Sequence, residues 1–249
     1  MTEDTGLPAS FEMAWGVRDR PTKGPKRGLS LARIIDAGVR VATAEGIGAV
    51  SMSRVASELG TSAMSLYRYV ASKDELLWLM IDGAFGQVEF AAPAEGTWRE
   101  RLEQWARHEL VALRRFPWIL RIPISSAPIM PHQLRFMEWG LRALGGTKLA
   151  EDEKMSVLLL VTSYTRSYAG LSGDLMAAVE AGSPLAQARD YGGLIKKLTT
   201  AEEFPALHAA VDAGAFADDD DPAGALDYDF RFGLERIFDG VAALMDRRE

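Results

Sequence analysis

The chain has 249 residues and no cysteine, which excludes disulfide frameworks, thiolate zinc sites and cysteine nucleophiles. Hydrophobic residues at 48% and charged residues at 25% match an ordinary globular protein with a substantial core. No stretch approaches the roughly 20 apolar residues of a spanning helix, and the first residues lack the pattern of a signal peptide. We therefore expect a cytoplasmic protein without a membrane partner.

The net charge of −7 is distributed unevenly along the chain. The stretch from Arg18 to Lys73 carries a net charge of +6, so the remainder carries −13. This asymmetry indicates a polyanion-binding end on an acidic body, although chance clustering on a solvated face gives the same count. Residues 1–28 are broken by prolines and glycines and predict an unstructured basic arm. Such an arm either follows DNA phosphates or only solubilises the chain.

Residues 29–76 predict a domain of three helices. Ser30 has the position of an N-cap, and apolar residues then recur at helical spacing as far as the glycines at 46 and 48. The stretch from Ser51 to Lys73 predicts two short helices joined by a tight turn at Gly60, a residue that tolerates positive φ. The second of these helices is expected over residues 63–70. This is the pattern of a helix-turn-helix, in which one helix braces the phosphates and the other enters the major groove.

The rest of the chain predicts further helices and no strand. Two capping boxes, beginning at Ser72 and Thr97, open helices expected over 73–89 and 98–115. Five more helices are expected at about 132–144, 152–181, 184–197, 202–214 and 230–245. The run of aspartates at 218–221 is expected to be a solvated loop. The fold class predicted is therefore all-α, with an N-terminal helix-turn-helix and a larger helical domain over 77–249.

These residues resemble the DNA-binding domain of the tetracycline-repressor (TetR) family. The matching segments are Val55–Gly60, Ser65–Tyr67 and Val70 followed by Lys73–Leu77. The segment from Trp98 to Pro117 resembles, more loosely, a tetracycline-repressor-like C-terminal domain. The resemblance implies a homodimeric, all-helical transcription factor that binds a palindromic operator on double-stranded DNA. It also implies a repressor that a small molecule releases from DNA.

The candidate DNA-binding residues lie at the start of the bracing helix, along the reading helix and just after it. They are Ser51, Ser53, Ala63, Met64, Ser65, Tyr67, Arg68, Tyr69 and Lys73. Arg68 suits either a bidentate contact to guanine or a phosphate contact, while Met64 and Ala63 suit thymine methyl groups. The hydroxyls of Tyr67 and Tyr69 and the ammonium of Lys73 are expected to bind phosphates.

Aromatic residues concentrate between positions 98 and 139, and Tyr164 and Tyr168 follow at i and i+4 on the long helix. They favour an apolar cavity for a flat or hydrophobic effector, although the same residues suit an ordinary core. The candidate effector-binding residues are Trp105, His108, Trp118, Phe136, Trp139, Tyr164 and Tyr168. The family places the dimer interface on the last long helices, where the candidates are Leu160, Ala169, Gly173, Leu234, Phe238 and Val241. An alternative is that both helices are buried within one subunit.

No metal ligand set and no cofactor motif is recognisable. A nucleophile elbow, a phosphate-binding loop and an HExxH motif are also missing, which argues against an enzyme. Two interpretations therefore remain open. One is a repressor with a small-molecule effector, and the other is a DNA-binding regulator without one.

Overall fold

The computed structural model describes residues 6–17, 29–89, 95–183, 190–216 and 222–247, and in these ranges the chain forms helices and no strand. The all-α prediction is thereby confirmed. The chain divides into two compact units, Met1–Ala169 with Gly240–Glu249, and Gly170–Asp239. No helix in the described ranges is long and apolar enough to cross a membrane.

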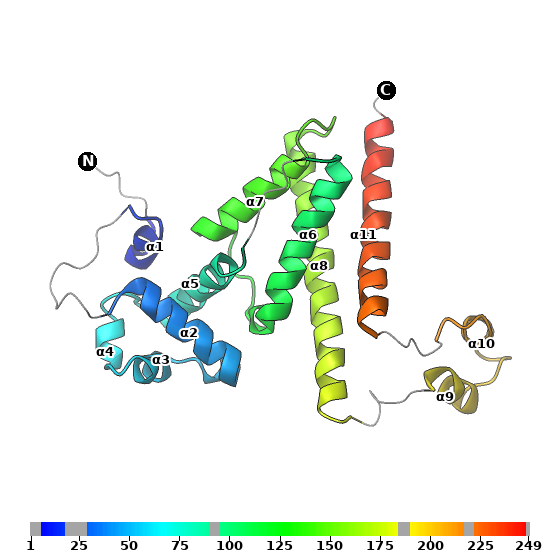
Figure 1. Cartoon of the computed structure of the whole chain (residues 1–249), viewed down its shortest axis with the longest axis horizontal. Helices are drawn as coiled ribbons and strands as arrows, with labels where there is room; N and C mark the ends of the chain where they lie inside the picture. Colours follow the sequence, from blue (N-terminus) through cyan, green and yellow to red (C-terminus); the bar gives the residue numbers. More distant parts are fainter. Residues whose placement is uncertain (1–5, 18–28, 90–94, 184–189, 217–221, 248–249) are drawn as a thin grey trace. The chain divides into compact units, whose positions relative to one another are not determined.

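The predicted helix-turn-helix is present as α2 (Leu31–Glu45), α3 (Met52–Glu58) and α4 (Ala63–Leu66), which lie together in Figure 1. A short 3-10 turn, η1 (Ile47–Ala49), connects α2 to α3. Ser30 caps α2 as predicted, since its hydroxyl accepts the Arg33 N–H at 3.3 Å. Gly60 has a φ of +64° at the turn between α3 and α4, also as predicted.

The reading helix α4 is shorter than the predicted 63–70. It ends at Leu66, and beyond it the Tyr69 N–H donates to the Leu66 carbonyl at 2.8 Å. This i to i−3 bond is of the tighter 3-10 type, and the same carbonyl also accepts the Val70 N–H at 3.0 Å, so the chain closes in a turn after α4. The reading element is therefore one α-turn followed by a tight turn.

The prediction that residues 1–28 are unstructured is wrong for α1 (Ala9–Ala14), which packs on α2 and α5. Phe11 is 7% exposed, and the Ser10 hydroxyl donates to Glu75 Oε2 at 2.7 Å. A helix of six residues is too short to show a clear period, and packing on other helices is what stabilises it. The basic run over 18–28 lies outside the described residues.

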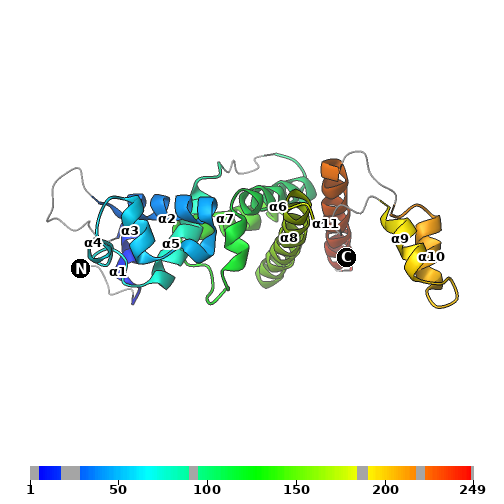
Figure 2. The same ribbon diagram turned by 90° about the horizontal axis from the view of Figure 1, so that it is seen from below.

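Helix α5 (Lys73–Gly86) crosses α2 closely, as both views show (Figures 1 and 2). A Cβ on Gly38 would lie 2.6 Å from Met80 Sδ, so the glycine in α2 makes room for the methionine in α5. Ser72 caps α5 by accepting the Glu75 N–H at 3.1 Å. The capping box predicted there is only half formed, because the Glu75 carboxylate accepts the N–H of Ala71 and the Ser10 hydroxyl.

The remaining helices follow the predicted order. They are α6 (Trp98–Arg115), η2 (Pro117–Arg121), α7 (Pro131–Ala143), α8 (Glu151–Glu180), α9 (Tyr191–Leu198), α10 (Pro205–Asp212) and α11 (Pro222–Asp246). However, α9 begins at Tyr191 instead of 184, and α11 begins eight residues before the predicted 230. Residues 184–189 lie outside the described residues. The capping box at Thr97 is complete, with Glu100 returning to the Thr97 N–H at 2.7 Å. In the second unit α9 and α10 pack together, and Lys196 pairs with Asp212 across them.

One buried carboxylate joins α5 to α7. Asp82, 5% exposed, accepts the backbone N–H groups of His132 at 2.8 Å and Gln133 at 3.0 Å. Its other oxygen lies 2.8 Å from His132 Nδ1. The first N–H groups of a helix have no partner within the helix, so a carboxylate from α5 serves as the missing cap of α7.

Replacing Asp82 with alanine should lower the free energy of unfolding by about 2–4 kcal/mol, since two buried N–H groups lose their acceptor. Asp82→Asn should cost less, because its amide oxygen still accepts and the His132 ring can accept from its NH₂. Urea unfolding of both variants measures the difference. Asp36→Ala, an exposed position in α2, is the control, and equal losses at 36 and 82 would contradict the capping role.

Candidate nucleic-acid interface and internal cavity

The predicted DNA-binding residues are mostly on the surface around α3 and α4. Met64 is 75% exposed and Tyr67 48% exposed, while the side chains of Ser53, Arg68 and Lys73 are also exposed. Ala63 and Ser65 are half-buried. Ser51 is the N-cap of α3, and its hydroxyl accepts the Arg54 N–H at 3.1 Å. The helix start is therefore formed before any phosphate is bound.

Tyr69 differs from the expectation that its hydroxyl faces a phosphate. The residue is half-buried, and the hydroxyl donates to the Leu29 carbonyl at 2.8 Å. The proton that a phosphate oxygen would accept is therefore already used within the domain. Tyr69 joins the end of the reading turn to the segment that precedes α2.

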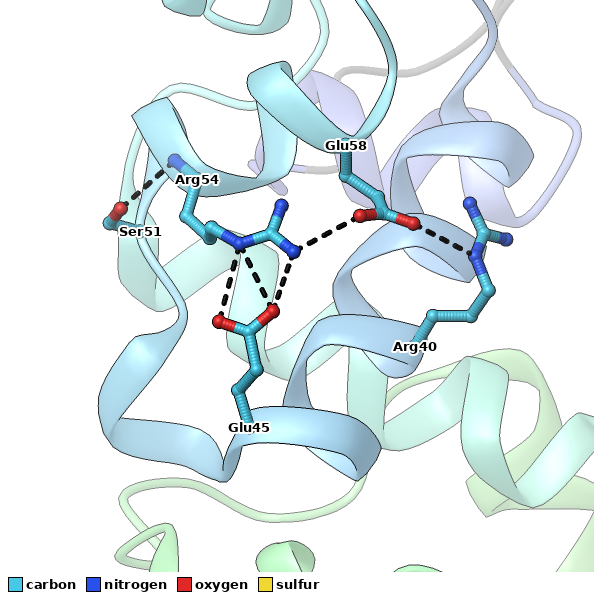
Figure 3. A network of polar contacts seen from close by, with 5 residues as sticks. All are labelled: Arg40, Glu45, Ser51, Arg54 and Glu58. Carbon is cyan, nitrogen blue, oxygen red and sulfur yellow. Dashed lines mark hydrogen bonds and ion pairs between the residues drawn. The ribbon is translucent and has the colours of Figure 1, made fainter.

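A charge network that the sequence analysis did not identify stiffens the bracing helix (Figure 3). The Arg54 guanidinium donates to Glu45 Oε1 at 2.5 Å and to Glu58 Oε2 at 3.1 Å. Arg40 approaches the other oxygen of Glu58 at 3.5 Å. Hydrogen bonding to Arg54 lowers the pKa of the Glu45 carboxyl, and the bonds to Glu45 and Glu58 raise the pKa of Arg54. The network ties α3 to the C-terminal end of α2.

The network changes how the basic stretch from 18 to 73 is understood. Arg40 and Arg54 are engaged by glutamates, and five further basic residues fall within 18–28, outside the described residues. Of the cations predicted to bind DNA, Arg68 and Lys73 are exposed beside α4 and at the start of α5. The net charge of the stretch alone could not distinguish arginines that pair with glutamates from cations that are exposed.

The first unit contains a cavity of about 500 Å³. Its walls come from α5, α6, η2 with the loop that follows, α7 and the first half of α8. Apolar residues dominate the lining, among them Trp78, Ile81, Phe85, Trp105, Ile119, Ile122, Phe136, Met137, Met155 and Leu158. A mostly apolar space of this size with a few polar groups is typical of a small-molecule site.

A buried acid, Glu109, lies in this apolar wall. It is 3% exposed, and burial raises the pKa of its carboxyl to about 8, against smaller lowering effects of Arg166 and Thr162. Its Oε2 and the Oε1 of Gln133 have no hydrogen-bond partner. The sequence analysis did not identify Glu109, although it falls on the apolar face of α6 between Trp105 and Leu113, where a charged residue is unusual.

Of the predicted effector residues, Trp105 and Phe136 line the cavity and stack on each other with ring centroids 4.6 Å apart. Trp118 is buried elsewhere, where its indole donates to Thr43 Oγ1 at 3.2 Å. The other four predicted residues are outside the lining as well: His108, Trp139, Tyr164 and Tyr168. The alternative that many of these aromatics are core therefore describes Trp118 correctly.

The predicted dimer-interface residues fall into two groups. Ala169, Leu234, Phe238 and Val241 are buried in the single chain, at 5% exposure or less. Leu160 is 50% exposed, and Gly173 is exposed. The residues that remain available for a second copy are thus on α8 rather than on the buried face of α11.

A helix-turn-helix with exposed reading residues, followed by a larger helical domain with an apolar cavity, is typical of DNA-binding transcriptional regulators. Residues 34–78 match the model of the bacterial regulatory proteins of the tetR family, and residues 90–245 match the tetracyclin repressor-like C-terminal domain. The chain belongs to the TetR family, a family of helix-turn-helix transcriptional regulators that are not enzymes.

Relatives with known names support this assignment. The transcriptional repressor DrrR1 of Streptomyces coeruleorubidus is 34% identical over 99% of this chain and 91% of its own. The repressor Rv1353c of Mycobacterium tuberculosis is 27% identical over 93% of this chain and 86% of its own. Among solved structures, ActR of Streptomyces coelicolor in complex with actinorhodin has a TM-score of 0.75 and 27% identity, covering 90% of this chain and all of that one.

The two tyrosines of the reading turn should respond differently to loss of the hydroxyl. Tyr69→Phe should lower the free energy of unfolding by about 0.5–1.5 kcal/mol, because the bond to the Leu29 carbonyl is lost. Tyr67→Phe, at an exposed position, should leave stability unchanged and weaken DNA binding. Thermal unfolding and a DNA-binding titration of both variants test this, and reversed effects would contradict the placement of Tyr69.

Proposed function

We propose that this protein is a homodimeric transcriptional repressor that a small, flat, largely apolar molecule releases from a palindromic operator. The observation that carries the proposal is the position of α5. It begins next to the reading turn, supplies Trp78, Ile81 and Phe85 to the cavity wall, and holds the N-terminus of α7 through Asp82. A ligand that displaces this wall also moves the helix that follows the reading turn in the chain and packs on α2.

DNA reading is the best supported part of the proposal. Met64 lies on the one-turn helix α4, Tyr67 and Arg68 lie on the tight turn that follows it, and all three are exposed. Arg68 is the candidate for a guanine or phosphate contact, and Ser53 and Lys73 are candidates for phosphates. Two copies related by a two-fold axis would read half-sites about 34–36 Å apart or a multiple of that spacing.

A second copy of this chain is the proposed cover for an exposed apolar face of α8. Leu171 and Leu175 in the second unit, each at least half exposed, recur at i and i+4 and so share one side of the helix. A row of exposed leucines of this kind is unusual on a monomer. Phe232 on α11, 50% exposed, is a further candidate for this interface.

Release by a ligand requires that the ligand prefers the conformation that does not bind DNA. The cavity supports this part of the proposal, as does the ActR structure solved with actinorhodin. In this chain α5 and α7 supply two of the cavity walls, and Asp82 joins these two helices. The alternative is a regulator without an effector, and a test of DNA release by aromatic compounds distinguishes the two.

Arg68→Ala should weaken binding to an operator selected from random duplexes by about tenfold or more, since one good contact supplies about 1–3 kcal/mol. A salt titration identifies the contact. An unchanged slope of log K against log salt indicates a base contact, and a slope smaller by about 0.9 indicates a phosphate. Arg142→Ala, an exposed pair partner of Glu138 on α7, is the control. Unaltered affinity in Arg68→Ala would contradict the assignment of the reading turn.

Met137→Trp should fill part of the cavity and abolish release of the DNA by polycyclic aromatic compounds, actinorhodin among them, while leaving DNA binding intact. Fluorescence anisotropy of a labelled operator measures both properties. Arg135→Trp adds the same group to an exposed position of α7 outside the lining and should still be released. If no compound of a broad aromatic library releases the wild-type protein, the regulator acts without such an effector.

A further inference from the structure

The polar side chains in the cavity wall include three that carry a charge or an amide, and these come from three different helices. Glu109 comes from α6, Gln133 from α7 and Arg166 from α8. The carboxyl of Glu109 is buried with one oxygen unpaired, and the amide oxygen of Gln133 is also unpaired. Unpaired buried polar atoms are costly, so these groups indicate a ligand with polar atoms of its own.

The charge of the lining decides which polar atoms fit. Glu109 and Arg166 are its only ionisable side chains among the described residues. Burial raises the pKa of Glu109 to about 8, so at pH 7 the carboxyl is mostly protonated and Arg166 leaves the site with a net charge of +1. The wall from α5 is apolar, and the nearby Asp82 and His132 are paired with each other. On α6, burial lowers the pKa of His108 and favours its neutral form.

An anionic ligand makes the net charge of this site zero without any change of protonation. A cationic ligand would have to ionise Glu109 and would still leave a net charge of +1, and a neutral ligand would leave Arg166 without a counter-charge. Arg166 is half-buried beside the apolar wall, and a partly desolvated charge without a partner is unfavourable. The amide oxygen of Gln133 accepts only, so it requires a hydrogen-bond donor on the same ligand.

We propose that the cavity binds an aromatic acid, a flat apolar molecule that carries one carboxylate or acidic phenol for Arg166 and a hydroxyl or N–H donor for Gln133, with Glu109 as an uncharged neighbour that discriminates against cations. This rests on the proposed function, because it assigns a ligand class to the effector cavity. It goes further in naming the charge of the ligand and the residues that select it.

Three naphthalene probes of nearly equal size test the charge. They are 6-hydroxy-2-naphthoate, its methyl ester and 6-(aminomethyl)-2-naphthol, titrated by isothermal calorimetry into the full chain without DNA. The acid should bind at least tenfold more tightly than the ester or the amine at pH 7. Arg166→Met should lower the affinity for the acid to that for the ester, and Arg142→Met, outside the cavity, should have no effect.

The pH profile tests the part played by Glu109. The affinity of the wild-type protein for the acid should fall about fourfold from pH 6.5 to 8.5, because a carboxylate at position 109 appears as the pH passes 8 and repels the anion. Glu109→Gln stays uncharged at every pH and should bind the acid with a flat profile. The ester, which carries the same phenol, should show no such fall in either protein.

Failure of the acid to bind more tightly than the ester and the amine overturns the inference, as does a fall with pH that persists in Glu109→Gln. DNA release is measured separately on the labelled operator. An acid that binds through Arg166 and leaves the DNA bound contradicts the proposed release mechanism but supports the ligand class. Release by uncharged compounds with no dependence on Arg166 supports the mechanism and overturns the ligand class.

Discussion

The carboxylate of Asp82 is the interaction on which the arrangement of the first unit depends. It stands in for the N-terminal cap that α7 lacks, and it does so from α5, a helix whose other side is packed into α2. Because both oxygens are used, α5 and α7 cannot separate without leaving buried N–H groups unpaired. Gly86 makes the close approach possible, since a Cβ there would lie 2.8 Å from the His132 ring. The helix-turn-helix and the cavity wall thus share one rigid element.

In the helix-turn-helix, acidic side chains hold a basic one in place. Glu45 and Glu58 fix the Arg54 guanidinium between α2 and α3, so that the bracing helix keeps its position without DNA. All three groups are partly exposed, so salt will weaken the network. The network helps to fix α3 on α2, and α4, which lies just before Arg68 in the chain, packs on α3.

The sequence predicted the fold well where local signals agree with the final packing. Helix starts at Ser30, Ser51, Ser72 and Thr97 were predictable because a hydroxyl that accepts an N–H three residues later depends on neighbours in the chain. Helix α1 was not predictable, since its stability comes from burial of Phe11 on helices that follow it in sequence. Local pattern carries no information about such long-range contacts.

The functional sites could be predicted only in part, because local patterns do not reveal long-range contacts. Met64, Tyr67 and Arg68 follow from the turn at Gly60, whereas Tyr69 does not, because its partner is the Leu29 carbonyl, 40 positions away. The cavity residues required a knowledge of which helices face one another. Aromatic density identified Trp105 and Phe136 but also Trp118, which is bound to Thr43. The polar residue Glu109 could have been found from its place on an apolar helix face, a signal that aromatic counting ignores.

Helix α1 has a consequence for how such chains are divided. The family match begins at residue 34, after α1 and the cap of α2. A DNA-binding fragment cut at that boundary would lose Phe11 from its core and the Ser10 hydroxyl from the Glu75 carboxylate. It would also lose Trp15, whose indole donates to the Ile129 carbonyl in the loop between η2 and α7. The segment around α1, which the family pattern does not include, thus contacts both the start of α5 and the loop beside the cavity. A fusion partner or tag is best attached ahead of this segment through a linker.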